Sequence, residues 1–144
     1  MDRSTPPLGS HYQELILEHY KQPRNRGTVA GATSDVHLNN PTCGDEIHLQ
    51  LRVGEEGIEE ARFEGQGCSI SQASASMMTQ LVTGKTREEA LQLTARFKEL
   101  MHGDESAARD RALGDLRALA GVSKFPARVR CALLSFNALE DSLK

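Results

Sequence analysis

Apolar and polar side chains alternate along residues 47–53, which read Ile-His-Leu-Gln-Leu-Arg-Val. A period of two residues is typical of a strand with one face buried. A glycine-bounded turn at 54–57 follows, and residues 58–64 return as the partner strand of a hairpin. A shorter strand is expected near 35–38. The pattern therefore predicts a small antiparallel sheet of about three strands.

Most of the remaining chain shows the 3.6-residue period of amphipathic helices. We expect helices at about 11–21, 69–83, 86–101 and 107–120, and one from Pro126 onward. Thr86 with Glu89, and Ser69 with Gln72, have the spacing of capping boxes. The last helix is apolar on two sides, which predicts a central position. The fold class is therefore α+β, with a three-stranded antiparallel sheet packed by about five helices.

The 144 residues suit one domain, expected at 10–144 behind a flexible tail at 1–9. The net charge of −3 argues against a nucleic-acid partner, because no excess of positive charge is available to neutralise phosphates. No apolar run is long enough to span a bilayer, and the N-terminal residues do not resemble a signal peptide. We therefore expect a cytoplasmic protein without a membrane partner.

The cysteines and one aspartate form the most informative set: Cys43, Asp45, Cys68 and Cys131. Three cysteines in a reducing compartment argue against a disulfide framework. Thiolate and carboxylate groups are zinc ligands, and four of them close a tetrahedral site. Cys43 and Asp45 share one loop, while Cys68 stands at an expected helix start, where the backbone amides favour a thiolate. The set predicts one metal site, with Arg128 and Arg130 available to offset its negative charge.

The same residues also allow readings without a metal. Buried cysteine is common as a small apolar side chain, and aspartate is common in turns. The chain contains no paired Cys-x-x-Cys motif. Its five histidines show no ligand spacing with any cysteine, and we expect them on the surface or on helix faces. Residue spacing alone therefore leaves both interpretations open.

Three motifs add a resemblance to a known family. They are Asn40-Pro41-Thr42-Cys43-Gly44-Asp45, the run from Phe63 to Ser71 that contains Gly65-Gln66-Gly67-Cys68, and Arg130-Cys131-Ala132. In this order they resemble the motifs of the U-type iron–sulfur assembly proteins, the IscU/SufU family with its NifU N-terminal-like members. The SufU type is the nearer match. Arg130 stands where the IscU pattern has histidine, residues 124–128 lack the Leu-Pro-Pro-Val-Lys chaperone motif, and residues 103–121 fit the segment that SufU-type proteins add.

The resemblance implies a SufE/IscU-like fold and a function in iron–sulfur cluster assembly. It implies a zinc-dependent sulfurtransferase, with Zn²⁺ bound by Cys43, Asp45, Cys68 and Cys131. Cys43 is then the catalytic residue: it leaves the metal and accepts persulfide sulfur from a SufS-type cysteine desulfurase. Downstream iron–sulfur assembly proteins are the expected recipients. The implied exchange is a thiolate attack on the terminal persulfide sulfur.

Two other functions remain as alternatives at this stage. The first is an IscU-like scaffold that assembles a [2Fe–2S] cluster on the same ligands, because thiolates bind such clusters as readily as zinc. The second is a structural zinc module that acts through protein interactions. A zinc hydrolase is remote, because it needs an open coordination position and a base for which the sequence shows no motif.

Overall fold

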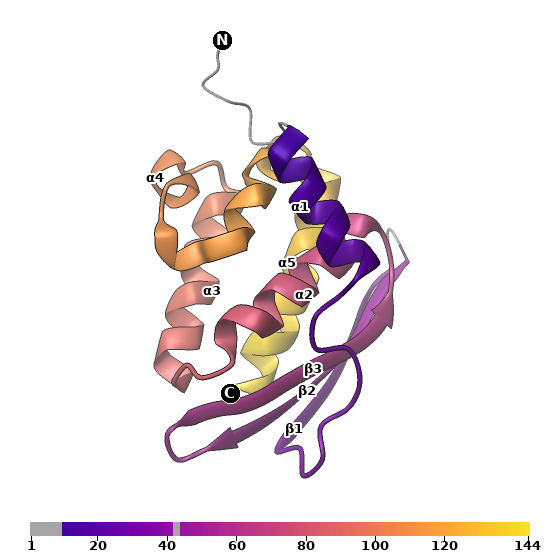
Figure 1. Ribbon diagram of the computed structural model, residues 1–144, viewed down its shortest axis with the longest axis vertical. Coiled ribbons are helices and arrows are strands. Elements are labelled where there is room, and N and C mark those ends of the chain that lie inside the picture. Colours follow the sequence, from indigo (N-terminus) through magenta and orange to yellow (C-terminus); the bar gives the residue numbers. More distant parts are fainter. Residues whose placement is uncertain (1–9, 42–43) are drawn as a thin grey trace.

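The sheet forms one layer of the protein and the helices form the other (Figure 1). The structure is a computed structural model that describes residues 10–41 and 44–144. The antiparallel strands β1 (Ser34–Asn40), β2 (Asp45–Gly54) and β3 (Gly57–Gln66) lie in the order β1-β2-β3. This confirms the predicted three-stranded sheet. The strands run further than their apolar patterns indicated, because pairing continues through polar residues to Asn40 opposite Asp45.

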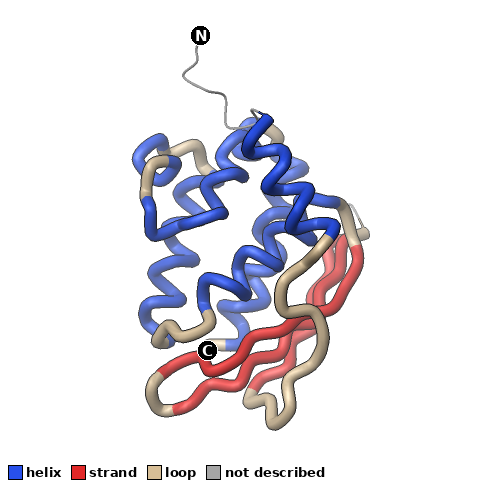
Figure 2. Tube along the Cα trace, in the orientation of Figure 1, coloured by secondary structure: helices blue, strands red, loops and turns tan. Residues whose placement is uncertain are grey.

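The alternation along β2 decides which face of the sheet is covered. Ile47, Leu49 and Leu51 are buried on the side of the helices, and Figure 2 shows the helices gathered on that side. The intervening residues, including His48 and Gln50, lie on the outer face. The expected half-buried strand is therefore confirmed.

The helical layer contains five α-helices and one 3-10 helix among the described residues: α1 (Ser10–Lys21), α2 (Ser69–Val82), α3 (Arg87–Met101), α4 (Glu105–Ala108), η1 (Arg111–Lys124) and α5 (Pro126–Ser142). Helix α5 contacts β1, β2, α2, α3 and η1, which confirms its predicted central position. The rings of Phe97 and Phe136 stack with their centroids 4.4 Å apart and join α3 to α5. No helix in the described part of the chain is long and apolar enough to cross a membrane.

The helix starts agree with the sequence in two cases and differ in one. Thr86 and Glu89 form the expected reciprocal capping box, and Pro126 occupies the first turn of α5. The predicted Ser69–Gln72 box is wrong. Helix α2 begins one residue earlier, with Cys68 at the N-cap position, and the side chain of Gln72 is buried.

The predicted α-helix at 107–120 is also wrong, since the segment divides into the short α4 and the 3-10 helix η1. The Asp110 side chain accepts a hydrogen bond from the Ala112 amide and starts η1 afresh. Gly114 then adopts a positive φ of 51°, which breaks a regular α-helix. Arg96 on α3 donates a 2.7 Å hydrogen bond to Asp110 and holds the pKa of that carboxyl below its usual value. This contact ties the segment to α3.

His19 was expected at the surface or on a helix face, and the structure places it on the buried face of α1. Its side chain is fully buried beneath α1 and connects three elements. Nδ1 lies 2.7 Å from Ser76 Oγ on α2, and Nε2 lies 2.9 Å from Asp115 Oδ2 on η1. The Arg24 amide also donates to Ser76 Oγ. Both ring nitrogens therefore have polar partners, which is what allows a histidine to be buried here.

Replacement of His19 by alanine should destabilise the protein by about 2–4 kcal/mol, because it opens a cavity and leaves buried polar groups without a partner. Urea unfolding measures this free energy. His11→Ala, an exposed position of the same helix, is the matched control and should change it by less than about 0.5 kcal/mol. Equal effects of the two substitutions would show that the His19 bridge carries no stability.

Candidate metal centre

Three of the four residues in the predicted site meet at one end of the sheet. Asp45 begins β2, Cys68 is the N-cap residue of α2, and Cys131 lies in the second turn of α5. Their ligand atoms all lie within 4.8 Å of one another. Cys43, the predicted catalytic residue and fourth ligand, lies outside the described residues. The fold thus brings together side chains that are 23 and 63 residues apart along the chain.

The hairpin between β1 and β2 positions Asp45. Asn40 pairs with Asp45 at the end of the hairpin, and the Gly44 amide donates a 2.9 Å hydrogen bond to the Asn40 carbonyl. Gly44 has a φ of +74°, a conformation that glycine adopts at little cost. The Asp45 side chain is only 1% exposed, and its Oδ1 accepts a 3.0 Å hydrogen bond from the Cys68 amide.

Gly67 allows the close approach of β3 and α2 to Asp45. Its φ is +155°, and a Cβ atom at this position would lie 2.3 Å from Asp45 Oδ1 and 2.5 Å from Ser71 Oγ. Any side chain would therefore push the carboxylate away from the Cys68 amide. The glycine before Cys68 is a geometric requirement of the cluster.

The two cysteines are held by helices that are themselves joined. Cys68 is half-buried and makes no side-chain capping hydrogen bond, while Cys131 is 3% exposed. The Cys131 sulfur lies 3.6 Å from the Ala127 carbonyl oxygen. Ser74 of α2 donates a 2.7 Å hydrogen bond to the carbonyl of Ala132, next to Cys131. This bond fixes α2 against α5 where the two sulfurs approach.

The donor set suits a thiophilic metal. Two sulfurs and one carboxylate match the ligand preference of Zn²⁺ and exclude hard cations such as Mg²⁺, which bind through oxygen. Three ligands leave one position of a tetrahedral site, and Cys43 stands two residues before Asp45 in the sequence. The predicted charge compensators Arg128 and Arg130 are both exposed.

A hollow of about 440 Å³ lies beside the cluster, between α1, the start of α2 and the start of α5. Its lining is largely apolar: Gln13, Ile16, Leu17, Ser69, Ile70, Val122, Phe125 and Arg128. Phe125 is 51% exposed and Leu17 is 45% exposed. Ser69 directly follows Cys68, so the hollow adjoins the candidate metal centre.

A second group of potential ligands was not predicted from the sequence. Asp35, His37 and His48 converge on the outer face of the sheet. The signal was present in the strand pattern, since His37 and His48 occupy outward positions of neighbouring strands. Only the strand register, however, places them opposite each other.

Comparison with known proteins agrees with this architecture. A model of the NifU-like N-terminal domain family matches residues 11–132. The zinc-dependent sulfurtransferase SufU of Bacillus subtilis is 52% identical over 137 residues, covering 94% of this chain and 91% of the relative. The iron–sulfur cluster assembly scaffold protein IscU of Streptococcus pyogenes is 46% identical over 137 residues, covering 95% and 85%. A solved iron–sulfur cluster assembly scaffold protein for the SUF system from Fervidobacterium islandicum superposes with a TM-score of 0.84 at 36% identity, covering 94% of this chain and 100% of that one.

Fold and cluster together define a small α+β protein built around a candidate thiolate-rich metal centre. The chain belongs to the NifU-like N-terminal domain family, which includes the IscU and SufU proteins. The resemblance seen in its three motifs is thereby confirmed.

Gly67→Ala should weaken Zn²⁺ binding about 10- to 100-fold, the range found when a group that orients a ligand is lost. The added methyl group displaces Asp45 from the Cys68 amide. Competition with a chromophoric chelator measures the affinity. Gly103→Ala is the control: its φ is +89°, but a Cβ there has open space around it. It should cost about 1–2 kcal/mol of stability and leave metal affinity unchanged. Wild-type affinity in Gly67→Ala would remove this role from Gly67.

Proposed function

We propose that the protein is a zinc-dependent sulfurtransferase of iron–sulfur cluster assembly, which accepts persulfide sulfur from a cysteine desulfurase of the SufS type. The observation that carries the proposal is the group of buried Asp45, half-buried Cys68 and buried Cys131, with ligand atoms within 4.8 Å of one another. The third cysteine, Cys43, lies two residues before Asp45 in the sequence. The 52% identity to a protein named a zinc-dependent sulfurtransferase supports the same assignment.

The elements that carry Asp45, Cys68 and Cys131 support the assignment of these residues as metal ligands. Asp45, Cys68 and Cys131 would hold Zn²⁺ together with Cys43. Bound Zn²⁺ would keep the sulfur ligands deprotonated near neutral pH. Cys68 and Cys131 are built into helices that Ser74 joins, so they are the permanent ligands. Cys43, which stands two residues before Asp45 in the sequence, is the sulfur acceptor.

The transfer is an exchange at a persulfide. The Cys43 thiolate attacks the outer sulfur of the desulfurase persulfide, and a new S–S bond forms on Cys43. The original S–S bond breaks, and its electron pair leaves on the desulfurase cysteine as a thiolate. No oxidant or reductant is consumed. Coordination to Zn²⁺ would lower the nucleophilicity of the Cys43 thiolate, so the metal would protect this sulfur until a persulfide donor is present.

Sulfide release by a SufS-type desulfurase, with dithiothreitol as the final reductant, should rise at least about tenfold when the zinc-loaded protein is added, equivalent to about 1.4 kcal/mol of the activation barrier. Cys43→Ser should abolish the stimulation while lowering zinc content only partly, because three ligands remain. Retained stimulation in Cys43→Ser would remove the acceptor role from Cys43.

The metal-stripped protein and Asp45→Ala serve as the companion tests. Both should lose stimulation, and Asp45→Ala should also retain less zinc than the wild-type protein. If neither the metal nor Asp45 affects the reaction, the zinc-dependent transfer is excluded. A purely structural zinc module would bind metal but leave the desulfurase unstimulated, so the same assay separates these two functions.

The apolar hollow beside Ser69 is the surface on which we place the desulfurase. A sulfur donor must reach the end of the sheet that carries Asp45, and the hollow borders that end. Exposed aromatic side chains in such positions carry much of the binding energy at protein interfaces. Phe125 is therefore the expected anchor.

Phe125→Ser should raise the desulfurase concentration that gives half-maximal stimulation by about tenfold. This change is equivalent to about 1.4 kcal/mol of binding free energy. Serine is favoured at the N-cap position that Phe125 occupies, so folding should be preserved. Leu91→Ser on α3, an exposed apolar residue (38%) outside the hollow, is the control and should behave as wild type. Titration of stimulation with both variants tests the surface, and equal curves would place the desulfurase elsewhere.

The second candidate function is a scaffold for a [2Fe–2S] cluster. It is favoured by the 46% identity to a protein named an IscU scaffold, and by two thiols that suit iron–sulfur ligation as well as zinc. Anaerobic reconstitution with iron and sulfide discriminates the two. A stable visible chromophore that Cys68→Ser abolishes, combined with no stimulation of the desulfurase, would favour the scaffold.

A further inference from the structure

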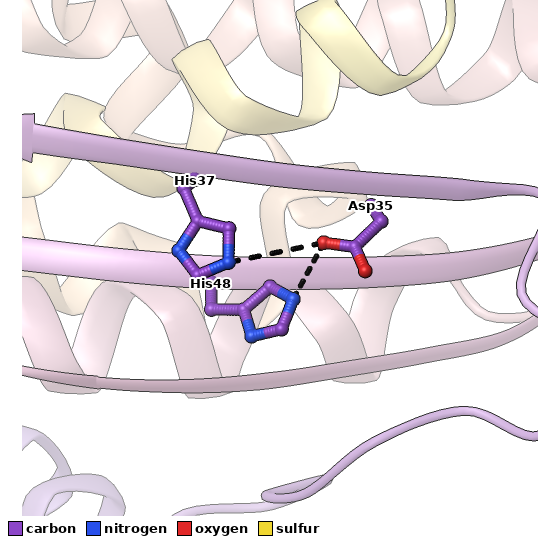
Figure 3. A group of neighbouring side chains, drawn as sticks. All are labelled: Asp35, His37 and His48. Atoms are coloured by element: carbon purple, nitrogen blue, oxygen red, sulfur yellow. Dashed lines mark hydrogen bonds and ion pairs between the residues drawn. The ribbon is translucent and has the colours of Figure 1, made fainter.

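The outer face of the sheet carries three potential metal ligands at one point. Asp35 and His37 project from β1, and His48 projects from β2 (Figure 3). The register pairs His37 directly with His48, while Asp35 lies two residues along β1 on the same face. Side chains in these positions are neighbours in any antiparallel pair. Asp45, by contrast, has the inward phase of β2, so the sheet separates this group from the cysteine cluster.

The distances in the group are close to those of a metal site. Asp35 Oδ1 lies 2.6 Å from His48 Nε2 and 4.0 Å from His37 Nε2. The two imidazole rings stack with their centroids 3.9 Å apart and their planes 19° apart. Zn–N and Zn–O bonds of about 2.0–2.2 Å place tetrahedral ligand atoms about 3.3 Å from one another. The observed distances lie on either side of this value, so small side-chain rotations bring all three donors to one ion.

The carboxylate is held in place by a neighbour. Gln50 donates a 2.9 Å hydrogen bond to Asp35 Oδ2, which leaves Oδ1 directed at the imidazoles. The Gln50 amide oxygen in turn accepts a 2.7 Å hydrogen bond from the Val29 backbone amide. A ligand fixed through an anchored outer partner is the arrangement that metal sites use to orient carboxylates.

The group is also open to solvent. The side chains of His37 and Asp35 are 73% and 52% exposed. A hollow of about 410 Å³ adjoins them, lined by both histidines together with Leu38, Asn39, Glu46, Ile47, Glu64 and Gly65. Glu46 and Glu64 add two negative charges around the imidazoles. A cation can therefore enter without rearrangement of the backbone.

We propose that Asp35, His37 and His48 form a second metal site, which binds one divalent first-row transition ion and leaves its remaining coordination positions to solvent. Two imidazoles and one carboxylate select Zn²⁺, Co²⁺, Ni²⁺ or Fe²⁺ over Mg²⁺ and Ca²⁺. His48 alone would be enough to form an ion pair with Asp35. The strand register also places the imidazole of His37 against that of His48, which an ion pair does not require. The site is independent of the cysteine cluster and of the function proposed for it.

Co²⁺ is the probe that separates the two sites. Bound to thiolates it gives an intense ligand-to-metal charge-transfer absorption, and bound to imidazole and carboxylate it does not. Protein preloaded with one equivalent of Zn²⁺ should bind a further equivalent of Co²⁺ without this absorption. The imidazole NMR signals of His37 and His48 should then shift and broaden at substoichiometric Co²⁺. Those of His11, His19 and His102 should stay unchanged.

Substitutions on the exposed strand face complete the test by calorimetric titration with Zn²⁺. His37→Gln should lose the second equivalent of bound Zn²⁺. Gln50→Ala should lower the affinity for that second ion about tenfold. His102→Gln, an exposed histidine outside the group, should keep it. Equal stoichiometry in wild type and His37→Gln, or Co²⁺ effects on His11 and His102 as large as on His37, would overturn the proposal. The comparison of wild type with His37→Gln does not depend on whether the cysteine cluster binds zinc, because the substitution should remove one bound equivalent in either case.

Discussion

The hydrogen bond from the Cys68 amide to the Asp45 carboxylate is the contact on which the site depends. It joins the start of β2 to the start of α2 and thereby connects the two layers of the fold. A carboxylate at a helix N-terminus is also favoured by the helix dipole. A side chain at position 67 would collide with Asp45, so this glycine affects both the local backbone and the cluster.

The sheet divides two kinds of ligand chemistry. On its inner side, the sulfurs of half-buried Cys68 and buried Cys131 lie near the buried carboxylate of Asp45. On its outer side, imidazole donors lie open to solvent beside Glu46 and Glu64. The cysteine sulfurs and the histidine imidazoles thus lie on opposite faces of the sheet. The strand period of two is the reason, since it sends Asp45 and His48 to different sides.

The sequence predicted most of what depends on local periodicity. The sheet, the Thr86 capping box and the central α5 follow from apolar spacing and cap chemistry. The hydrogen-bond partners of His19, Ser76 and Asp115, could not be predicted, because only the tertiary structure brings them to its ring. The 3-10 character of η1 was missed because Asp110 restarts the backbone within an apparently regular helical pattern.

The cluster itself was foreseen by resemblance more than by spacing. Cys68 and Cys131 are 63 residues apart, and no local rule brings them together. The contact depends on Ser74 holding α2 against α5, which is a consequence of global packing. These buried residues suit a transferase and a scaffold equally, since both need the same anchored thiolates. The physical difference between the two functions must therefore lie around the cluster: in the chemistry of Cys43, and in the surface between α1 and Phe125 on which we place the desulfurase.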